Sequence, residues 1–283
     1  MVTFVSTHPN FVSALILSCA MGVACAVLSV LVVLRRWAFI GEGIAHAGFG
    51  GIGTAAALSL IVPSLGNEGA AFLVAVVFCL ATAVAIGWIS RSRAVSGDAA
   101  IGIFVAASLA WGFVGFAIAE NRGHFAQSWN TYLLGSVGNV SRAAMLAGVA
   151  VSVAVLLVLA ALSKQILLYC FDPTLAEVTG VATGFVHYLL IVLLALVIVV
   201  GMRLAGNLLV PALLVLPGAT ALAMSVRLRT VVLTSIVVSL VAVVAGLCAS
   251  LRWRFLPAGP SMVLVLFLEF ALAAAFRRRP ATA

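Results

Sequence analysis

Long apolar runs, separated by short polar, glycine- or proline-containing stretches, make up most of the chain. Several runs approach the roughly 20 residues that an α-helix needs to cross a bilayer. The pattern predicts helices over residues 11–34, 40–62, 70–89, 98–119, 143–162, 184–202, 207–226, 231–250 and 260–276. Residues 131–140 contain two glycines and form either a short span or a re-entrant segment. We therefore predict an all-α, polytopic membrane helical bundle with about nine transmembrane helices, or about eight if one segment is re-entrant.

Composition agrees with this class. The chain has 283 residues, of which 65% are hydrophobic and 8% charged, and its mean hydropathy is +1.32. A soluble protein of this length needs more charge on its surface. We expect a single transmembrane domain over residues 1–283, with a cytoplasmic segment at about 171–181 and no separate soluble domain.

The positive charge indicates orientation rather than nucleic-acid binding. The net charge is +8, but the basic residues do not form a stripe interleaved with aromatic residues. Most lie in alternate connections between the predicted helices, which the positive-inside rule places in the cytoplasm: Arg35, Arg36, Arg91, Arg93, Lys164, Arg227, Arg229 and 277–279. Residues 1–10 carry no Lys or Arg, so we expect no signal peptide. We predict a multi-pass protein of the cell (inner or plasma) membrane, with its N-terminus outside and its C-terminus in the cytoplasm.

Glu42 and His46 are the strongest candidates for chemistry. They lie four residues apart near the start of an apolar run, so a helix puts both side chains on one face about 6 Å apart. Ionisable side chains are costly inside a bilayer and therefore mark functional sites. Carboxylate and imidazole both bind first-row metals, but two ligands do not complete a coordination shell, and a homodimer would supply two more. The structural alternative places Glu42 at the inner water interface near Arg35 and Arg36, with His46 bonded to a backbone carbonyl.

A second acidic residue, Glu269, lies near the middle of the last apolar run. A carboxyl group there must pair with another group or line a cavity, so a buried structural pair and a place on a transport path both stay open. The glycines from Gly48 to Gly53 favour close helix packing over a loosened helix that lines a path.

The polar stretch before residue 181 predicts a short helix of its own. Asp172 is a good N-cap, Pro173 suits the first helical position, and Gly180 can end the helix after Glu177. The segment is either an ordinary connector or a helix that docks a soluble partner.

The chain has no nucleotide-binding loop. Such a loop needs G-x-x-x-x-G-K-[ST], and the only lysine, Lys164, lies between Ser163 and Gln165. If ATP drives this protein, another subunit binds the nucleotide.

Four motifs together resemble one family. Residues 33–47 (V-L-R-R-W-A-F-I-G-E-G-I-A-H-A) are similar to an element of the membrane permeases of bacterial ABC importers for zinc, manganese and chelated iron, in which an arginine pair precedes Gly-Asp-x-x-x-His. Residues 96–102 (S-G-D-A-A-I-G), 208–220 (L-L-V-P-A-L-L-V-L-P-G-A-T) and 256–260 (L-P-A-G-P) also agree, in order and at compatible spacing. The chain departs from the family in two places: Glu42 replaces the usual Asp, and residues 49–51 replace a Pro-Gly after the histidine.

The resemblance implies an all-helical permease with no permanently bound cofactor, whose cargo is a divalent transition-metal ion, zinc ahead of manganese. It implies three partners: a second copy of the chain, a cytoplasmic ATP-binding subunit that hydrolyses ATP, and an extracytoplasmic metal-binding protein. The family's acid and histidine carry over to Glu42 and His46. Its coupling helix corresponds to about 171–181, where the residues expected to bind the ATPase are Asp172, Pro173, Ala176, Glu177 and Gly180.

Two other classes are weighed against this one. A proton- or sodium-coupled secondary metal transporter would use Glu42 and Glu269 as relays and need no ATPase. A metal-dependent intramembrane hydrolase would need a fuller ligand set and a general base, whereas the sequence offers one embedded histidine beside an acid.

Overall fold

The computed structural model describes residues 11–92, 96–121, 142–205, 209–253 and 256–276. In these ranges it contains α-helices, one 3-10 turn and no strand. The elements are α2 (Phe11–Leu34), α3 (Ala38–Leu58), η1 (Pro63–Gly66), α4 (Glu68–Ser92), α5 (Gly97–Asn121), α7 (Arg142–Ala161), α8 (Ser163–Phe171), α9 (Pro173–Val178), α10 (Thr183–Ala205), α11 (Leu209–Met224), α12 (Leu228–Arg252) and α13 (Ala258–Ala275).

The predicted membrane helices are all present as α-helices. Seven of the described helices are long and apolar enough to cross a membrane: α2, α4, α5, α7, α10, α12 and α13. The helix α11 is apolar but shorter, with 16 residues, and α3 has 21 residues but carries glycines, Glu42 and His46. The prediction of a polytopic helical bundle is therefore confirmed, with a number of spans near the expected range. The candidate re-entrant segment 131–140 lies outside the described residues.

The helix α3 is shorter than predicted at its C-terminal end. The prediction ran to residue 62, whereas the helix ends at Leu58. Val62 has an extended backbone (φ −124°, ψ 92°) because it precedes Pro63, whose ring disfavours helical geometry in the preceding residue. The four residues from 59 to 62 therefore form a turn that leads into η1.

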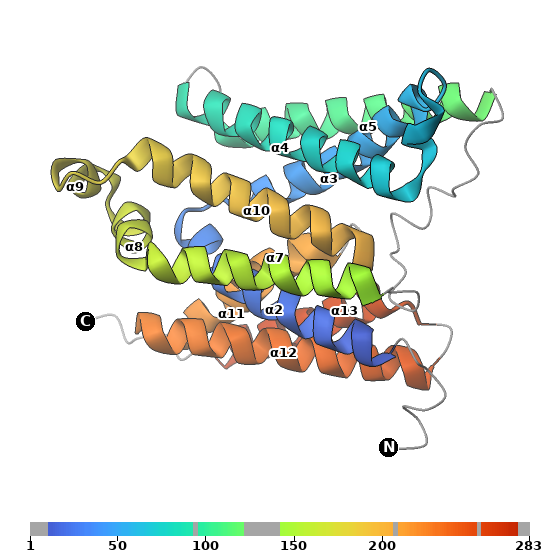
Figure 1. Ribbon diagram of the computed structural model, residues 1–283. Helices are drawn as coiled ribbons and strands as arrows, with labels where there is room; N and C mark the ends of the chain where they lie inside the picture. Colours follow the sequence, from blue (N-terminus) through green and yellow to red (C-terminus); the bar gives the residue numbers. More distant parts are fainter. Residues whose placement is uncertain (1–10, 93–95, 122–141, 206–208, 254–255, 277–283) are drawn as a thin grey trace.

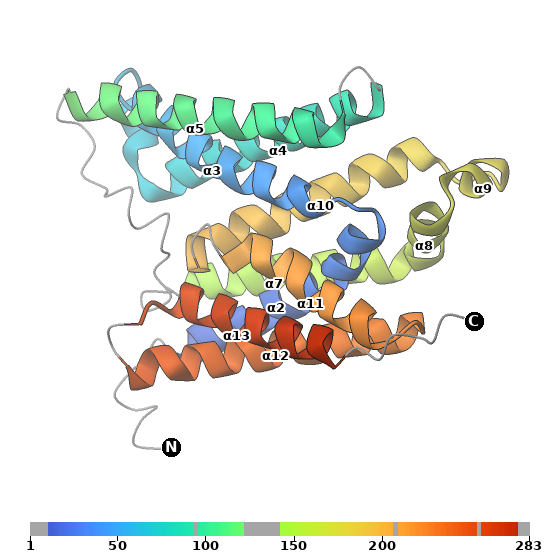
Figure 2. The ribbon, with the colours of Figure 1, turned by 180° about the vertical axis from the view of Figure 1, so that it is seen from behind.

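The helices form a layered bundle. Figure 1 shows α4 and α5 along one side, α12 and α13 along the opposite side, and α2, α7, α10 and α11 between them. The helix α3 packs most extensively on α5 and α4, and also contacts α10 and α11. Seen from behind, α3, α5, α11 and α13 lie on the face turned towards the viewer (Figure 2). The short helices α8 and α9 extend beyond one end of the bundle.

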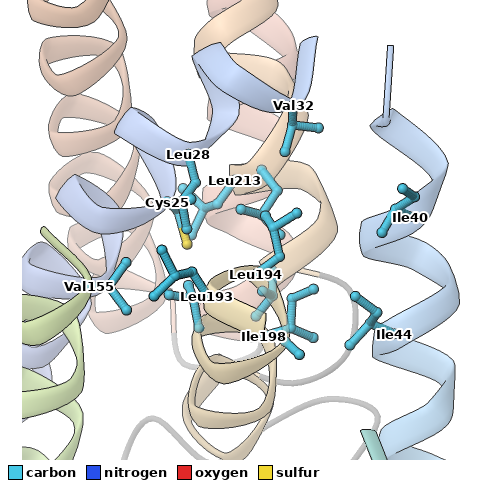
Figure 3. Packing of buried hydrophobic residues seen from close by; sticks show 14 of the residues in the cluster. Cys25, Leu28, Val32, Ile40, Ile44, Val155, Leu193, Leu194, Ile198 and Leu213 are labelled. Carbon is cyan, nitrogen blue, oxygen red and sulfur yellow. The ribbon is translucent and has the colours of Figure 1, made fainter. Parts of the chain in front are cut away.

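One large apolar cluster joins the layers. Figure 3 shows its centre, where Cys25 and Leu28 of α2 meet Leu194 and Ile198 of α10, with Ile44 of α3 close by. All five side chains are buried. Many large apolar side chains on the outer helices are instead exposed, as expected for a surface in contact with lipid: Leu73, Val77, Trp88, Phe113, Leu157, Leu233 and Phe267.

Glycines bring α3 and α5 into backbone contact. A Cβ atom on Gly53 would lie 2.5 Å from the carbonyl oxygen of Gly112 and 2.6 Å from its Cα, so only glycine fits at this crossing. Gly51 is as close to α4, since its Cβ would lie 2.6 Å from the Cα of Ala75. The glycines after His46 thus serve close packing, as predicted, and they fix the helix that carries the candidate site.

Candidate metal site

Glu42 and His46 form a hydrogen-bonded pair in the first three turns of α3. His46 Nε2 lies 3.0 Å from Glu42 Oε1. The glycines on either side of Glu42 show how the helix is held. A Cβ on Gly41 would contact Leu214 of α11 at 3.5 Å, and one on Gly43 would contact Ile101 of α5 at 3.1 Å. Because these two residues point to opposite neighbours, Glu42 projects between them from a face that stays partly open.

The pair has the spacing of two adjacent metal ligands. Two ligand atoms at about 2.0–2.2 Å from one ion, and at right angles, lie roughly 3 Å from each other. The Glu42 side chain is 47% exposed and that of His46 is 22% exposed, so both are accessible without being fully solvated. Among the described residues, no three His, Cys, Asp or Glu side chains gather at one place. Among the described residues, the pair therefore stands alone as a candidate for ligating a metal ion.

Arg35 makes its hydrogen bonds to Tyr169. Its Nη2 donates a hydrogen bond to the hydroxyl of Tyr169 at 3.0 Å, and its Nη1 donates to the backbone carbonyl of Tyr169 at 3.4 Å. The guanidinium group also lies over the Tyr169 ring, 4.3 Å from its centre. Burial raises the pKa of the Tyr169 hydroxyl, and the positive charge of Arg35 opposes that rise.

Glu269 lines a cavity instead of forming a buried pair. The cavity has a volume of about 1050 Å³ and lies between α11, α12 and α13, where Thr220, Ser225 and Arg227 also contribute to its wall. Glu269 Oε2 is buried and has no hydrogen-bond partner among the described residues. The structure thus puts Glu269 on a cavity, while its place on a transport path stays a prediction.

The short helix α9 begins as predicted. Asp172 Oδ1 accepts hydrogen bonds from the backbone amides of Thr174 at 2.9 Å and Leu175 at 3.0 Å. Pro173 occupies the first turn, where its missing N–H leaves nothing unsatisfied.

The helix also ends as predicted, at Gly180. This glycine has a left-handed backbone (φ +83°), its amide donates to the carbonyl of Glu177, and the amide of Val181 donates to the carbonyl of Ala176. The two bonds form a Schellman motif. Glu177 and Gly180 are exposed, but Ala176 is fully buried. The side chain of Ala176 therefore anchors α9 to the bundle and does not face outwards like the other residues expected to bind the ATPase.

The sequence did not single out Tyr169, which the structure brings together with Arg35 and His187 at the C-terminal end of α2. Tyr169 Oη lies 2.9 Å from His187 Nδ1. The partners Arg35 and Tyr169 are 134 positions apart in the chain, so no local pattern indicates their contact.

Comparisons with known proteins give the family. The chain matches the ABC 3 transport family over residues 7–277. It is 34% identical to the manganese transport system membrane protein MntC of Halalkalibacterium halodurans, over 92% of this chain and 85% of the relative. It is 33% identical to the chelated iron transport system membrane protein YfeD of Yersinia pestis, over 94% of this chain and 85% of that relative.

A solved structure agrees with the sequence comparisons. PsaBC from Streptococcus pneumoniae, determined in complex with Fab, is similar with a TM-score of 0.80 and 30% identity, covering 96% of this chain and 93% of that chain. The family match covers most of the chain, and the helices long enough to cross a membrane agree with a multi-pass protein. The chain therefore belongs to the ABC 3 transport family and is the membrane permease subunit of an ABC metal importer, in which a separate subunit hydrolyses ATP.

Proposed function

We propose that this permease imports a divalent first-row transition-metal ion and that the ion passes the Glu42–His46 pair. The observation that supports this most directly is the distance of 3.0 Å between His46 Nε2 and Glu42 Oε1 in α3, an apolar helix of 21 residues. Such groups are costly in a bilayer unless they act on a polar substrate. A pair of exchangeable ligands lowers the cost of dehydrating the ion without holding it so tightly that release stalls.

Manganese is the first choice of cargo, with zinc as the competitor. The relatives described above are named for manganese and for chelated iron. The expectation from the sequence that zinc comes first finds no support in those names. A carboxylate oxygen suits Mn²⁺, and imidazole suits zinc and other first-row metals, so the ligand pair is compatible with either ion.

The site is completed by a second copy of the chain. One copy offers two ligands, whereas a first-row ion takes four to six. The face in Figure 2 that carries α3 also carries α5, α11 and α13. Two copies that meet through this face would bring two Glu42–His46 pairs to one axis and form a Glu₂His₂ site.

The two protein partners bind at opposite ends of the bundle. The helix α9 docks the cytoplasmic ATP-binding subunit through its exposed residues Asp172, Pro173, Glu177 and Gly180. The end that carries α9 is cytoplasmic, which puts the N-terminus outside and the C-terminus in the cytoplasm. The metal-binding protein delivers the ion at the opposite end, and residues 1–283 act as a single permease domain.

Glu269 provides a second carboxylate within the bundle, on a cavity beside the path. Of the seven acidic residues, Glu269 lies well inside a helix long and apolar enough to cross a membrane, and Glu42 lies in the second turn of the apolar helix α3. The helix α11 contacts both α3 and α13, so it separates the two carboxylates.

The test is metal uptake by the complete importer. The permease, its ATPase and its binding protein are reconstituted in vesicles, and ATP-driven uptake of Mn²⁺ and Zn²⁺ is measured separately. We expect His46→Ala to lower uptake by at least about tenfold at equal protein content, because one of two ligands is lost. Glu120→Gln, an exposed acid at the end of α5, serves as the control and keeps normal uptake. Normal uptake by His46→Ala would remove the site, and uptake by the permease alone in a pH gradient would indicate a secondary transporter.

A further inference from the structure

A continuous chain of polar contacts ties four helical segments together at the end of the bundle that carries α9. Arg35, directly after α2, donates to the hydroxyl of Tyr169 in α8 at 3.0 Å. That hydroxyl lies 2.9 Å from Nδ1 of His187 in α10, and His187 Nε2 lies 3.3 Å from the carbonyl oxygen of Gly87 in α4. Tyr169 and His187 are both buried.

With His187 neutral, the chemistry of the end groups fixes the direction of every hydrogen bond. The guanidinium of Arg35 can only donate, and the carbonyl of Gly87 can only accept. His187 therefore carries its proton on Nε2, which donates to Gly87, and its Nδ1 accepts from the Tyr169 hydroxyl. The hydroxyl oxygen in turn accepts from Arg35. This network works only with a neutral His187 and with an intact hydroxyl on Tyr169.

Aromatic contacts hold the same residues in place. Arg35 lies over the ring of Trp37 as well as that of Tyr169, at 5.3 Å and 4.3 Å from the ring centres. Trp37 meets the ring of His187 edge-on, with 5.1 Å between centres. Gly87 permits the close approach of α4, because a Cβ there would lie 2.6 Å from Ile191 of α10.

The network connects the docking helix with the metal site. Tyr169 lies three residues before Asp172, the N-cap of α9, and the amide of Asp172 still donates to Leu168 of α8 at 3.0 Å. Arg35 lies at the turn into α3, seven residues before Glu42. A displacement of α8 is thus passed to the start of the helix that holds Glu42.

Two features mark the turn between α2 and α3. Arg35 Nε is buried and has no hydrogen-bond partner among the described residues. Arg36 has a positive φ of 57°, and among the described residues it is the one non-glycine residue with such a backbone. The amide of Arg36 donates to the carbonyl of Val33 and that of Trp37 to the carbonyl of Val32, so Arg36 is the left-handed residue of a Schellman motif that ends α2. The buried Nε of Arg35 without a partner is unfavourable as it stands.

We propose that Tyr169 and His187 are positioning residues that transmit movement of α9 to the α2–α3 turn and hence to the Glu42–His46 pair. This inference rests on the proposed function. When the ATP-binding subunit displaces α9, α8 moves with it, and Tyr169 draws Arg35 along. The turn at Arg36 then rotates the start of α3 and changes the position of its ligands.

The test measures ATP hydrolysed per ion transported in the reconstituted importer. Tyr169→Phe keeps the ring beneath Arg35 but removes the hydroxyl from the network. We expect ATP consumption per Mn²⁺ ion to rise on the order of tenfold, which corresponds to the loss of one hydrogen bond to a charged group. Tyr188→Phe is the matched control, because Tyr188 packs on His187 through its ring, with 5.3 Å between centres. We expect its ratio to stay at the wild-type value.

Variants of His187 separate transmission from stability. His187→Leu should raise the ratio like Tyr169→Phe, and His187→Gln, which can still accept from one side and donate from the other, should restore it in part. The melting temperature of each purified variant is measured beside it and should stay near that of the wild type. An unchanged ratio in Tyr169→Phe overturns the inference, as does a loss of activity that follows a fall in melting temperature. Failure of the wild type to transport either Mn²⁺ or Zn²⁺ with ATP would instead contradict the proposed function.

Discussion

Replacement of Gly53 by alanine tests how the helix that carries the metal site is held. A Cβ at this position would lie 2.5 Å from the carbonyl oxygen of Gly112 and 2.6 Å from its Cα. Non-bonded carbon atoms prefer about 3.5–4.0 Å, so α3 and α5 must separate by roughly 1 Å. Because the opposing atoms belong to the backbone, no change of side-chain rotamer relieves the contact.

The cost follows from overpacking in a close-packed interior. Such substitutions destabilise proteins by about 1–3 kcal/mol, which lowers the melting temperature by roughly 2–4 °C for each kcal/mol in a protein of this size. Metal uptake should fall several-fold at equal protein content, since Glu42 and His46 shift with α3. Gly69→Ala in α4 is the control: nothing lies within 4 Å of its added Cβ. We expect it to stay within about 0.5 kcal/mol of the wild type.

Thermal unfolding can be followed through buried thiols. Cys79 is fully buried, and its Sγ donates to the carbonyl of Ile44 in α3 at 3.6 Å, so a thiol-reactive fluorophore reports loss of this packing. The purified variants are heated in detergent with the reagent present. A melting temperature of Gly53→Ala equal to that of the wild type, or an equal fall in Gly69→Ala, would refute the argument from backbone contact.

Three further predictions concern the end of the bundle with α9 and the cavity. Burial raises the pKa of the Cys170 thiol to about 11. At pH 7.5 a maleimide should therefore label Cys170 roughly 100-fold more slowly than the exposed thiol of Phe171→Cys, and the labelling of Cys170 should become faster as the pH rises. Equal labelling rates for the two thiols would contradict this. Asp172→Ala removes the cap of α9, at a cost of about 1 kcal/mol, and should weaken binding of the ATPase in a pull-down, whereas Asp172→Asn should bind like the wild type. Glu269→Gln should slow Mn²⁺ uptake several-fold without changing the concentration of binding protein needed for half-maximal rate; the same loss in Glu120→Gln would argue against a special role.

Local signals in the sequence were sufficient for the helices and for α9. An apolar run of about 20 residues between charges has few alternatives to a membrane helix. Asp172, Pro173 and Gly180 each act on the backbone within four residues, so their effects can be read from their spacing. The Glu42–His46 contact was predictable for the same reason, because positions four apart on a helix are neighbours.

Contacts between helices that are far apart in the chain could not be predicted from the sequence. The bond of Arg35 to Tyr169 joins positions 134 apart, and that of His187 to Gly87 joins positions 100 apart. The positive-inside rule explains the charge of Arg35 but not its partner. In the same way, an acid in an apolar run indicates only that Glu269 needs a polar neighbour or a cavity. The packing of α11, α12 and α13 decides which of these it meets.

The α2–α3 turn divides the bundle into two packing groups. After the turn, α3 packs mainly on α4 and α5, whereas α2, before the turn, packs on α7, α11 and α12. The backbone contacts of α3 with α5 and α4 leave no room for sliding. Arg36, with its positive φ, lies between the groups. An importer that opens alternately to each side can therefore move α3, α4 and α5 as one body against α11.

Two cysteine pairs beside Glu42 test this division in a variant without the native cysteines. A Cβ on Gly43 lies 3.9 Å from the Cβ of Ile101, within the range of a disulfide, so Gly43→Cys with Ile101→Cys joins α3 to α5. Gly41→Cys with Leu214→Cys, bridged by a short bifunctional thiol reagent, joins α3 to α11 instead. Because the first bond lies within one body and the second crosses between two, we expect ATP-driven uptake to survive the first and to stop with the second. Equal inhibition by both bonds, reversed by reduction, would mean that α3 moves relative to α5 and that the transport motion divides the bundle elsewhere.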